Sequence, residues 1–319
     1  MTIKMAVIGE CMIELSENQG SILRHFGGDT LNTAIYLGRS NPQVQVQYVT
    51  ALGCDKISDD MLLQWQQEGI NTNLVQRIEG KLPGLYIIET DATGERTFHY
   101  WRNDAAARYW LRTQQAETVS QALREFDYIY LSGVSLAILP AEDRALLMTL
   151  LADARQYGAR IAFDNNYRPR LWSSVADARQ AYRDILALTD IAFLTFDDEV
   201  ALWSDQQESE AIARTISLGV VEIVVKRGAA PCYIVLADEQ FEIAALSLAK
   251  EQIVDTTAAG DSFSAGYLAA RLAGHTVPES AHYAHLLAGT VIQHRGAIMP
   301  VSAMPTSLIS NEANHVTLA

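Results

Sequence analysis

The chain has 319 residues, of which 49% are hydrophobic and 19% charged, and its formal net charge at pH 7 is −14. This length and composition are typical of a globular protein with one large core, or one core and a smaller appendage. The negative charge argues against a nucleic-acid-binding protein, which needs a basic face. No apolar run reaches the roughly 18 residues of a membrane span, and the strand-like start does not resemble a signal peptide. We therefore expect a cytoplasmic protein without membrane or nucleic-acid partners.

The three cysteines, Cys11, Cys54 and Cys232, are far apart in the sequence and form no CxxC pair. An odd number of widely spaced cysteines does not favour a disulfide framework or a thiolate metal site. We expect all three to be small buried hydrophobic side chains.

The chain begins with a buried strand and then departs from the pattern of a parallel sheet. Met5 to Gly9 is a continuous apolar run closed by glycine, which is typical of a strand covered on both faces. From Glu10 to His25 the apolar pieces are short and separated by polar turn residues. We expect these pieces to form short strands outside the main sheet.

A double glycine comes next, just before a predicted helix over residues 33–39. Gly27 and Gly28 let the backbone approach a ligand closely, and Asp29 and Asn32 offer hydrogen-bonding groups that suit sugar hydroxyls. The alternative is an ordinary strand-to-helix turn in which Asp29 is the N-cap.

A β-hairpin is predicted from two β-rich arms, residues 84–90 and 96–102, which flank a glycine-containing loop. This antiparallel pair does not fit a parallel sheet, so we expect a small separate sheet that covers a site as a lid. Tyr86, Tyr100 and Arg102 on the hairpin are candidates for substrate contact. The alternative is that they stabilise the sheet, as cross-strand aromatic pairs and edge arginines often do.

The rest of the chain alternates between buried strands and helices. Strands are predicted over residues 44–52, 128–131, 160–163, 191–194 and 222–225, and helices over 58–68 (with Ser58 near the N-cap), 141–157, 175–188 and 208–218. This alternation predicts βαβ units and a doubly wound parallel sheet. A second hairpin, over 231–236 and 241–245, and a helix over 278–292 come later.

Polar or glycine-rich segments follow these strands, at the sheet edge where ligands bind. They are residues 132–133, 164–170, 195–199 and 226–228. Arg168 is the most informative residue among them, because a planar guanidinium can hold a carboxylate or phosphate with two hydrogen bonds. A loop-fixing ion pair is its alternative role.

Two histidines, His282 and His285, share a face of the predicted helix over 278–292. No carboxylate completes a metal site with them, so we expect them to be packed or solvated. Residues 300–319 are polar and weakly periodic, and we expect this tail to be loosely held.

The segment from Asp255 to Phe263 is rich in small residues and lies between a β-like segment, 251–254, and a helix-like one, 263–272. Small side chains expose backbone N–H groups, and a helix that starts at Gly260 or Asp261 adds the positive end of its dipole, so the segment predicts an anion-binding site. A carboxylate beside a bound phosphate is repelled unless it takes a proton from a hydroxyl. Asp261 therefore predicts a general base beside a transferring phosphoryl group. A plain helix N-terminus capped by Asp261 is the alternative.

Together these motifs resemble the ribokinase or PfkB family of carbohydrate kinases, over essentially the whole chain. The resemblance rests on Gly27-Gly28-Asp29 with Asn32, the predicted hairpin, Lys226-Arg227-Gly228 and, above all, Asp255 to Asp261. It is closest to the bacterial members that phosphorylate 2-keto-3-deoxygluconate, in residues 7–15, 82–86, 97–102 and 164–170. Neither a Walker P-loop nor a dinucleotide-binding GxGxxG motif occurs.

The resemblance implies a single ribokinase-like α/β domain over residues 1–319. Its doubly wound, mainly parallel sheet would be flanked by helices, and its β-sheet lid would come from about residues 10–26 and 82–103. The implied activity is ATP-dependent phosphorylation of 2-keto-3-deoxygluconate to the 6-phosphate. The implied cofactors and partners are ATP, Mg²⁺, the sugar acid and further copies of the chain in a homo-oligomer.

Site roles follow from the same resemblance. Asp261 would be the catalytic base, and the backbone of Ala258, Ala259 and Gly260 would stabilise the phosphoryl charge. The sugar acid would be bound by Gly28, Asp29, Asn32, Tyr86, Tyr100, Arg102, Arg168 and Asp261. ATP would be bound by Asn166, Arg168, Lys226, Arg227, Gly228 and residues 258–261.

The sequence departs from the family pattern in two places. The family's anion hole usually begins with glycine, where this chain has Ala258. A positive φ would cost an alanine about 1 kcal/mol, so we expect a conformation that suits Ala258. The family's Asn-x-x-Glu motif lacks its asparagine in residues 195–199, which leaves Glu199 as a weak candidate for the group that orders the waters of Mg²⁺.

Three alternative functions remain open from the sequence. One is a kinase of a neutral sugar, of the fructokinase or ribokinase type. Another is a non-catalytic sugar- or nucleotide-binding module, and the third is a purely structural oligomer subunit. Asp261 discriminates the binding module from a kinase, because a binding module has no use for a base beside the phosphate site.

Overall fold

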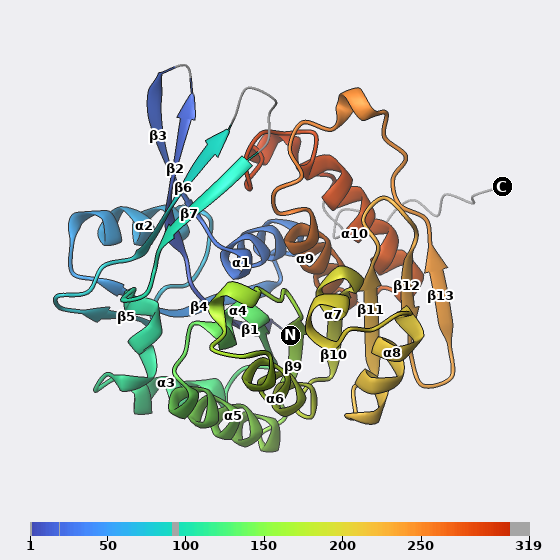
Figure 1. The fold of residues 1–319 in the computed structure, drawn as a ribbon, viewed down its shortest axis with the longest axis horizontal. Coiled ribbons are helices and arrows are strands. Elements are labelled where there is room, and N and C mark those ends of the chain that lie inside the picture. The colour runs from blue at the N-terminus through green and yellow to red at the C-terminus, as the bar shows by residue number, and fades with distance from the viewer. Residues whose placement is uncertain (1, 19, 91–95, 307–319) are drawn as a thin grey trace.

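A nine-stranded main sheet forms the centre of the computed structural model, which describes residues 2–18, 20–90 and 96–306 (Figure 1). Its strand order is β13-β12-β11-β10-β9-β8-β1-β4-β5. The parallel strands are β1 (Ile3–Ile8), β4 (Val44–Gly53), β5 (Val75–Ile78), β8 (Tyr128–Ser132), β9 (Arg160–Asp164), β10 (Ile191–Thr195) and β11 (Glu222–Lys226). At one edge, β12 (Cys232–Val235) and β13 (Gln240–Ile243) run antiparallel. The predicted mainly parallel, doubly wound sheet is confirmed.

Helices cover both faces of the main sheet. One face carries α1 (Asp29–Ser40), α2 (Lys56–Gln67), α9 (Ala259–Leu272) and α10 (Val277–Val291). The other carries α3 (Ala116–Leu123), α4 (Gly133–Ala137), α5 (Ala141–Gln156), α6 (Val175–Leu186), α7 (Phe196–Trp203) and α8 (Glu208–Ser217).

Alternate residues of each central strand serve the two resulting cores. In β1, Met5 and Val7 belong to one core and Ala6 and Ile8 to the other. Side chains of a strand point alternately to opposite faces, which explains why this strand is apolar throughout. Burying each large apolar side chain contributes roughly 1.5–3 kcal/mol, so the two cores hold the main sheet rigidly beneath the site.

A small sheet of four strands, in the order β3-β2-β6-β7, stands beside the carboxyl ends of the main sheet (Figure 1). Its strands are β2 (Met12–Asn18), β3 (Ser21–Gly27), β6 (Gly84–Thr90) and β7 (Arg96–Trp101). The predicted hairpin is its β6–β7 pair, which is antiparallel. The hairpin loop, residues 91–95, lies outside the described residues.

Several local predictions were wrong. Residues 251–254 do not form a strand, because the N–H groups of Val254 and Asp255 donate to the Ile292 carbonyl at the end of α10 rather than to a neighbouring strand. Residues 250–252 form a short 3₁₀ helix instead. The polar segment 195–199 after β10 is mostly helical, since α7 begins at Phe196 directly after the strand; this helix was not predicted from the sequence.

Two helix starts also differ from the sequence predictions. Helix α2 begins before Ser58, because Asp55 is its N-cap and accepts hydrogen bonds from the N–H groups of Ile57 and Ser58. Helix α1 begins at Asp29 with Gly28 as its N-cap, so Asp29 lies inside the first turn. A carboxylate in this first turn is favoured by the helix dipole.

Two of the three cysteines are buried, and so is His285. Cys11 and Cys232 are buried as expected, but Cys54 is exposed, because it lies in the turn that leads from β4 to α2. His285 is buried and one of its ring nitrogens is hydrogen-bonded to the Ile243 carbonyl. The last residues of the predicted tail, 307–319, lie outside the described part of the chain, and within that part no helix is long and apolar enough to cross a membrane.

Candidate active site

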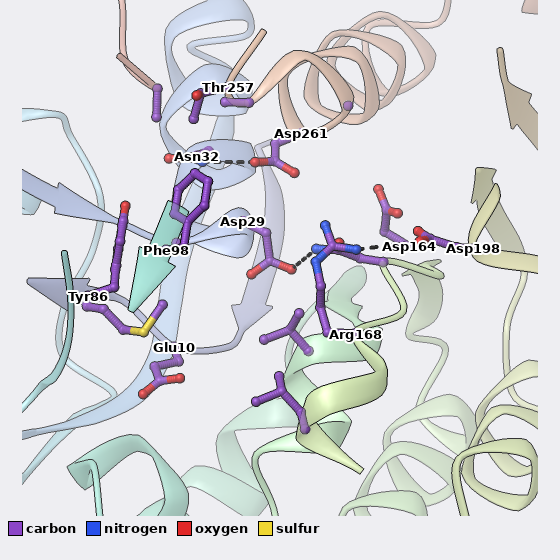
Figure 2. A pocket seen from close by; sticks show the side chains of 18 of the residues that line it. Glu10, Asp29, Asn32, Tyr86, Phe98, Asp164, Arg168, Asp198, Thr257 and Asp261 are labelled. Carbon is purple, nitrogen blue, oxygen red and sulfur yellow. Dashed lines mark hydrogen bonds and ion pairs between the residues drawn. The ribbon is translucent and has the colours of Figure 1, made fainter. Parts of the chain in front are cut away.

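A cavity of about 970 Å³ opens between the small sheet and the carboxyl ends of the main sheet. The first turns of α1 and α9, the ends of β9, β10 and β11, and the strands β6 and β7 contribute its walls. Figure 2 shows charged and aromatic side chains from these elements around one space. This is the position in which open α/β sheets bind their ligands.

The anion-binding segment forms the N-terminus of α9. The helix begins at Ala259, and Ala258 is its N-cap with φ 61° and ψ 14°. Our expectation for Ala258 was therefore wrong: it adopts the left-handed conformation, at a cost of about 1 kcal/mol. The reason is the sharp turn into α9. Asp255 stabilises this turn, because its carboxylate accepts hydrogen bonds from the N–H and hydroxyl groups of Thr257.

Asp261, in the first turn of α9, faces the first turn of α1. Asn32 Nδ2 donates to Asp261 Oδ2 over 2.8 Å, and the two side chains lie together in Figure 2. Burial raises the pKa of Asp261 to about 7, and the charges of Asp29 and Asp164 add to this shift. The hydrogen bond from Asn32 and the charge of Lys226 oppose it. A carboxylate with a pKa near neutrality can hold or accept a proton at physiological pH.

Asp29 and Asn166 connect α1 to the loop after β9. Asn166 Nδ2 donates a hydrogen bond to Asp29 Oδ2, and Asn166 has a positive φ of 23°. Backbone conformations of this kind persist where the surroundings impose them, often at functional sites. Gly28 precedes Asp29, and a Cβ there would lie 2.3 Å from the Glu10 carbonyl oxygen. The glycine is thus needed for the close approach of these two chain segments.

Arg102 is buried at the end of β7 and forms an ion pair with Glu10, which follows β1. The pair ties the small sheet to the main sheet at the cavity wall. Burial raises the pKa of Glu10, and Arg102 opposes that shift. Glu10 was not identified from the sequence; the signal available was a carboxylate directly after a buried strand.

Aromatic side chains of the small sheet face the same cavity. The rings of Tyr86 and Tyr100 lie 5.7 Å apart between centroids, and those of Phe98 and Tyr100 lie 6.3 Å apart and are stacked. The Tyr86 hydroxyl donates to the buried carboxylate of Glu14, and burial raises the pKa of that hydroxyl. Phe98 was missed, although its spacing of two residues from Tyr100 places both on one face of β7.

Arg168 lines the cavity with a side chain that is 54% exposed. Its Nη1 donates to the Tyr167 carbonyl over 2.8 Å and lies 3.5 Å from a carboxylate oxygen of Asp198. Burial raises the pKa of Asp198, and the charge of Arg168 opposes this shift. Most of the guanidinium of Arg168 therefore remains available to a ligand. Asp197 and Asp198, both missed from the sequence, also line the cavity.

Lys226, the last residue of β11, reaches Asp164 at the end of β9. Lys226 Nζ lies 2.6 Å from Asp164 Oδ2, and both residues line the cavity. Asp164 was not identified from the sequence; the signal available was its position at the start of the polar segment that follows a buried strand.

Three predicted residues lie outside the lining of this cavity. Arg227 forms ion pairs with Glu208 and Glu242 and lines a second cavity of about 410 Å³ between α8 and β12. Gly228 lies in the turn after β11 with φ 62°. Glu199 is buried beneath the site, where Asn165 Nδ2 donates to it over 2.8 Å and Arg214 Nη2 lies 2.6 Å away.

The arrangement supplies the parts of a phosphoryl transfer. Backbone N–H groups at the start of α9 can hold an anion, and Asp261 beside them can remove a proton from a hydroxyl. Arg102, Arg168 and Lys226 supply positive charge around the same space. A binding protein for a neutral ligand needs neither the base nor this set of cations.

Comparisons with known proteins agree with this chemistry. Residues 2–304 match the model of the pfkB family carbohydrate kinases. The 2-dehydro-3-deoxygluconokinase of Dickeya dadantii (strain 3937) is 58% identical over 309 residues, which cover 96% of this chain and all of that protein. The enzyme of the same name from Escherichia coli (strain K12) is 55% identical over 308 residues, with 96% of this chain and 100% of that protein covered.

The fold also has solved relatives. A putative ribokinase II of E. coli in complex with ATP and Mg²⁺ superposes with a TM-score of 0.81 at 21% identity, over 96% of each chain. Aminoimidazole riboside kinase of Salmonella enterica, in complex with aminoimidazole riboside and an ATP analogue, has a TM-score of 0.79 at 21% identity, over 93% of this chain and 96% of that one. At such identities these likenesses concern the fold.

Proposed function

The chain belongs to the pfkB family of carbohydrate kinases, and we propose that it transfers the γ-phosphoryl group of ATP to 2-dehydro-3-deoxygluconate, also called 2-keto-3-deoxygluconate. Relatives at 55–58% identity over their full length carry that activity in their names. The observation that carries the mechanism is Asp261, a carboxylate with a pKa near 7 in the first turn of a helix whose N-terminus opens into the cavity.

The proposed reaction is an in-line displacement. The oxygen of the sugar's 6-hydroxyl forms a bond to the γ-phosphorus, while Asp261 takes the proton of that hydroxyl. At the same time the bond from the γ-phosphorus to the β,γ-bridging oxygen breaks, and ADP leaves with the electron pair. The N–H groups at the start of α9 stabilise the charge on the equatorial oxygens. The products are the 6-phosphate and ADP.

The carboxylate of the sugar acid requires cationic partners, for which we propose Arg102 and Arg168. Arg168 keeps most of its guanidinium free, and Arg102 is fixed by Glu10 within the cavity wall. Gly28, Asp29, Asn32, Tyr86 and Tyr100 would surround the remainder of the sugar. This assignment is supported by their common place around the cavity.

The arginine assignment predicts a difference between an acidic and a neutral substrate. Arg168→Met should raise the KM for 2-keto-3-deoxygluconate by about tenfold or more, because one lost charge-assisted hydrogen bond contributes roughly 1.5–3 kcal/mol. The KM for 3-deoxyfructose, in which a CH₂OH group replaces the carboxylate, should change little. Arg102→Met should be paired with Glu10→Gln, so that no unpaired carboxylate stays buried. An equal rise in KM for both sugars would show that the arginines do not bind the carboxylate.

ATP would enter as the second substrate along Asn166, Arg168 and Lys226. Mg²⁺ binds ATP phosphates through hard oxygen ligands and needs only one or two protein carboxylates. Asp197 and Asp198 fit this requirement, because both line the cavity, whereas Glu199 is held by Asn165 and Arg214. Bound Mg²⁺ would neutralise part of the phosphate charge. Within the described residues no group of three or more His, Cys, Asp or Glu is placed to hold a metal alone.

The decisive experiment measures ADP release from MgATP with 2-keto-3-deoxygluconate, gluconate, fructose and ribose, for the wild type and Asp261→Asn. Turnover confined to the keto-deoxy acid and lost by a factor of about 10² or more in the variant would support the proposal, since general base catalysis contributes typically 10²–10⁴-fold. Turnover mainly with fructose or ribose would favour a neutral-sugar kinase. ATP binding without any turnover would favour a binding module.

We further propose that residues 1–319 act as one kinase domain, with the small sheet as the lid of the sugar site, and that the protein works in the cytoplasm, where ATP is supplied. A homo-oligomer is the proposed assembly. The face of the small sheet turned away from Tyr86 and Tyr100 carries Ile22 and Trp101, which are 76% and 59% exposed. We propose that a second copy covers these two exposed apolar side chains.

A further inference from the structure

The side chain of Lys226 is largely buried and contacts both Asp164 and Ser264. It is only 11% exposed, and its Nζ lies 2.6 Å from Asp164 Oδ2 and 3.5 Å from the hydroxyl oxygen of Ser264. Asp164 Oδ2 also accepts hydrogen bonds from the hydroxyls of Ser264, over 2.9 Å, and Tyr130, over 3.4 Å. Strands β8, β9 and β11 and helix α9 all contribute to this cluster, so the ammonium group occupies a fixed place.

That place borders the anion-binding segment. A Cβ built on Gly260 would lie 3.4 Å from Lys226 Nζ, with no other atom from outside the adjoining residues and the backbone of α9 within 4 Å. Ser264 lies one helical turn beyond Gly260 in α9. The helix that presents its N-terminal N–H groups to the cavity thus also fixes the ammonium beside them, and the absent side chain at Gly260 leaves the space between them open.

We propose that Lys226 is a catalytic residue that neutralises the charge developing on the transferring phosphoryl group, and that Asp164 and Ser264 are positioning residues that hold its ammonium at the start of α9. This inference rests on the proposed phosphoryl transfer. In that step the sugar hydroxyl oxygen bonds to the γ-phosphorus, its proton passes to Asp261, and the bridging oxygen leaves with ADP. Lys226 donates hydrogen bonds throughout and keeps its proton.

The fixed position distinguishes this role from simple ATP binding. Donors that are already in place where transition-state charge develops contribute to the rate, because they need no reorganisation during the reaction. An interaction that is equally strong in bound ATP and in the transition state changes KM but leaves kcat unaltered. The cluster around Lys226 therefore predicts an effect on kcat.

The first test compares Lys226→Met with the wild type for MgATP and 2-keto-3-deoxygluconate. The kcat should fall about 10²-fold, which is the typical effect of removing one such donor, and the KM for MgATP should stay within about threefold. Lys56→Met is the matched control, because Lys56 forms an exposed ion pair with Asp60 at the surface; its kcat should equal that of the wild type.

A second variant separates catalysis from folding. Lys226→Met leaves Asp164 as a buried carboxylate without its cation, which lowers stability. Adding Asp164→Asn should return the thermal midpoint from the lowered value of Lys226→Met to that of the wild type, but it should not restore kcat. Recovery of both quantities in the double variant would show that Lys226 serves the fold alone and would overturn the proposal.

The pH profile gives a readout that a purely structural role would not move. The groups that face Asp261 are Asp29 and Asn32 from α1, Asp164 from β9 and Lys226 from β11. Loss of the Lys226 cation should move the acid limb of kcat to higher pH, because that charge lowers the pKa of Asp261. Asp164→Asn should move the limb to lower pH. Limbs that coincide with the wild type in both variants would contradict the proposed geometry.

The outcomes also separate this inference from the proposed function. Wild-type protein that releases no ADP with any of the four sugars would refute the phosphoryl transfer itself. Wild-type turnover together with a kcat for Lys226→Met within threefold of normal, or a raised KM for MgATP at unchanged kcat, would leave the kinase intact and reject the catalytic role of Lys226.

Discussion

At the scale of single residues, Asp261 combines two influences that oppose each other. The N-terminus of α9 favours its charged form, whereas burial and the nearby Asp29 and Asp164 carboxylates raise its pKa to about 7. The result is a carboxyl group whose pKa lies near neutrality, well above that of an exposed aspartate, which suits the base that we propose. A general base is most effective when its pKa lies near the working pH.

This pKa predicts the pH dependence of the reaction. Because Asp261 must be deprotonated to accept the hydroxyl proton, kcat/KM should fall about tenfold per pH unit below a pKa near 7. Asp29→Asn should move this acid limb to lower pH, since the Asp29 charge raises the pKa of Asp261. Steady-state rates between pH 5 and 9 provide the measurement, with the surface variant Asp60→Asn as control. An acid limb near the ordinary aspartate value in the wild type would contradict this role of the buried site.

Ala258 shows how the same segment departs from local preference. Its φ of 61° is unfavourable for alanine, yet the turn into α9 and the hydrogen bonds of Asp255 to Thr257 determine it. Strain of this kind is maintained by the surrounding structure and is frequent at ligand-binding sites. Sequence rules that treat each residue alone favour the relaxed conformation.

At the scale of elements, the close packing of α9 on α10 places the anion-binding segment. A Cβ on Gly266 in α9 would lie 3.1 Å from the Cα of Ala284 in α10. A backbone atom cannot move aside as the end of a side chain can. The two helices can therefore approach this closely only because residue 266 has no side chain. The position of Asp261, in the first turn of the same helix, depends on this contact.

Gly266→Ala should therefore lower the free energy of unfolding by about 1–3 kcal/mol, the usual cost of overpacking, and should also reduce kcat as α9 shifts. Gly38→Ala in α1 is the matched control, because its Cβ would have only ordinary contacts, at 3.8 Å and 3.9 Å. Removing a helical glycine there should raise stability by about 0.4–1 kcal/mol. Urea denaturation measures both values, and a Gly266 variant as stable as the Gly38 variant would refute the packing argument.

The small sheet is a second element whose placement depends on a few contacts. Its strand β2 pairs in parallel with β6, which lies far along the sequence, and the Arg102–Glu10 ion pair joins it to the main sheet. Breaking a buried ion pair by removing one partner is strongly destabilising. The aromatic face of the sheet is thus held over the cavity by contacts near its base.

At the scale of the whole molecule, the two cores make the main sheet a rigid platform, while one face of the small sheet remains open to solvent. Ile22 and Trp101 are the most exposed large apolar side chains of this sheet within the described residues, and exposed apolar side chains of this size favour an association surface. On the proposed homo-oligomer, this face would be covered by another copy. The acidic net charge of −14 keeps other surfaces apart by repulsion.

Introducing charge on that face tests the assembly. Ile22→Glu combined with Trp101→Glu should shift the protein from oligomer to monomer in sedimentation equilibrium, because a charge buried in an interface without a partner is costly. Val221→Glu is the control, since Val221 is 61% exposed at a distant position before β11 and its variant should sediment like the wild type. A monomeric wild type, or an oligomer that persists in the double variant, would exclude this face as the interface.

The amino-acid sequence by itself determined the features that depend on neighbours along the chain. The periodicity of apolar residues predicted every parallel strand except β5, and it predicted helices α2, α5, α6, α8 and α10 to within about two residues. The small residues around Gly260 predicted the anion-binding helix start. These features arise from side-chain size, backbone sterics and hydrogen bonds within one element. They also sufficed to single out Asp261 as the residue that we propose as the base.

Only the tertiary structure decided the features that join distant segments. Asn32 and Asp261 are 229 positions apart, and Glu10 and Arg102 are 92 positions apart. No local pattern pairs such residues, because their proximity follows from strand order and helix packing. The same holds for the strain at Ala258 and for the place of Lys226 beside Asp164. The sequence supplies the chemical groups of the site, and the order of strands in the sheet brings them together.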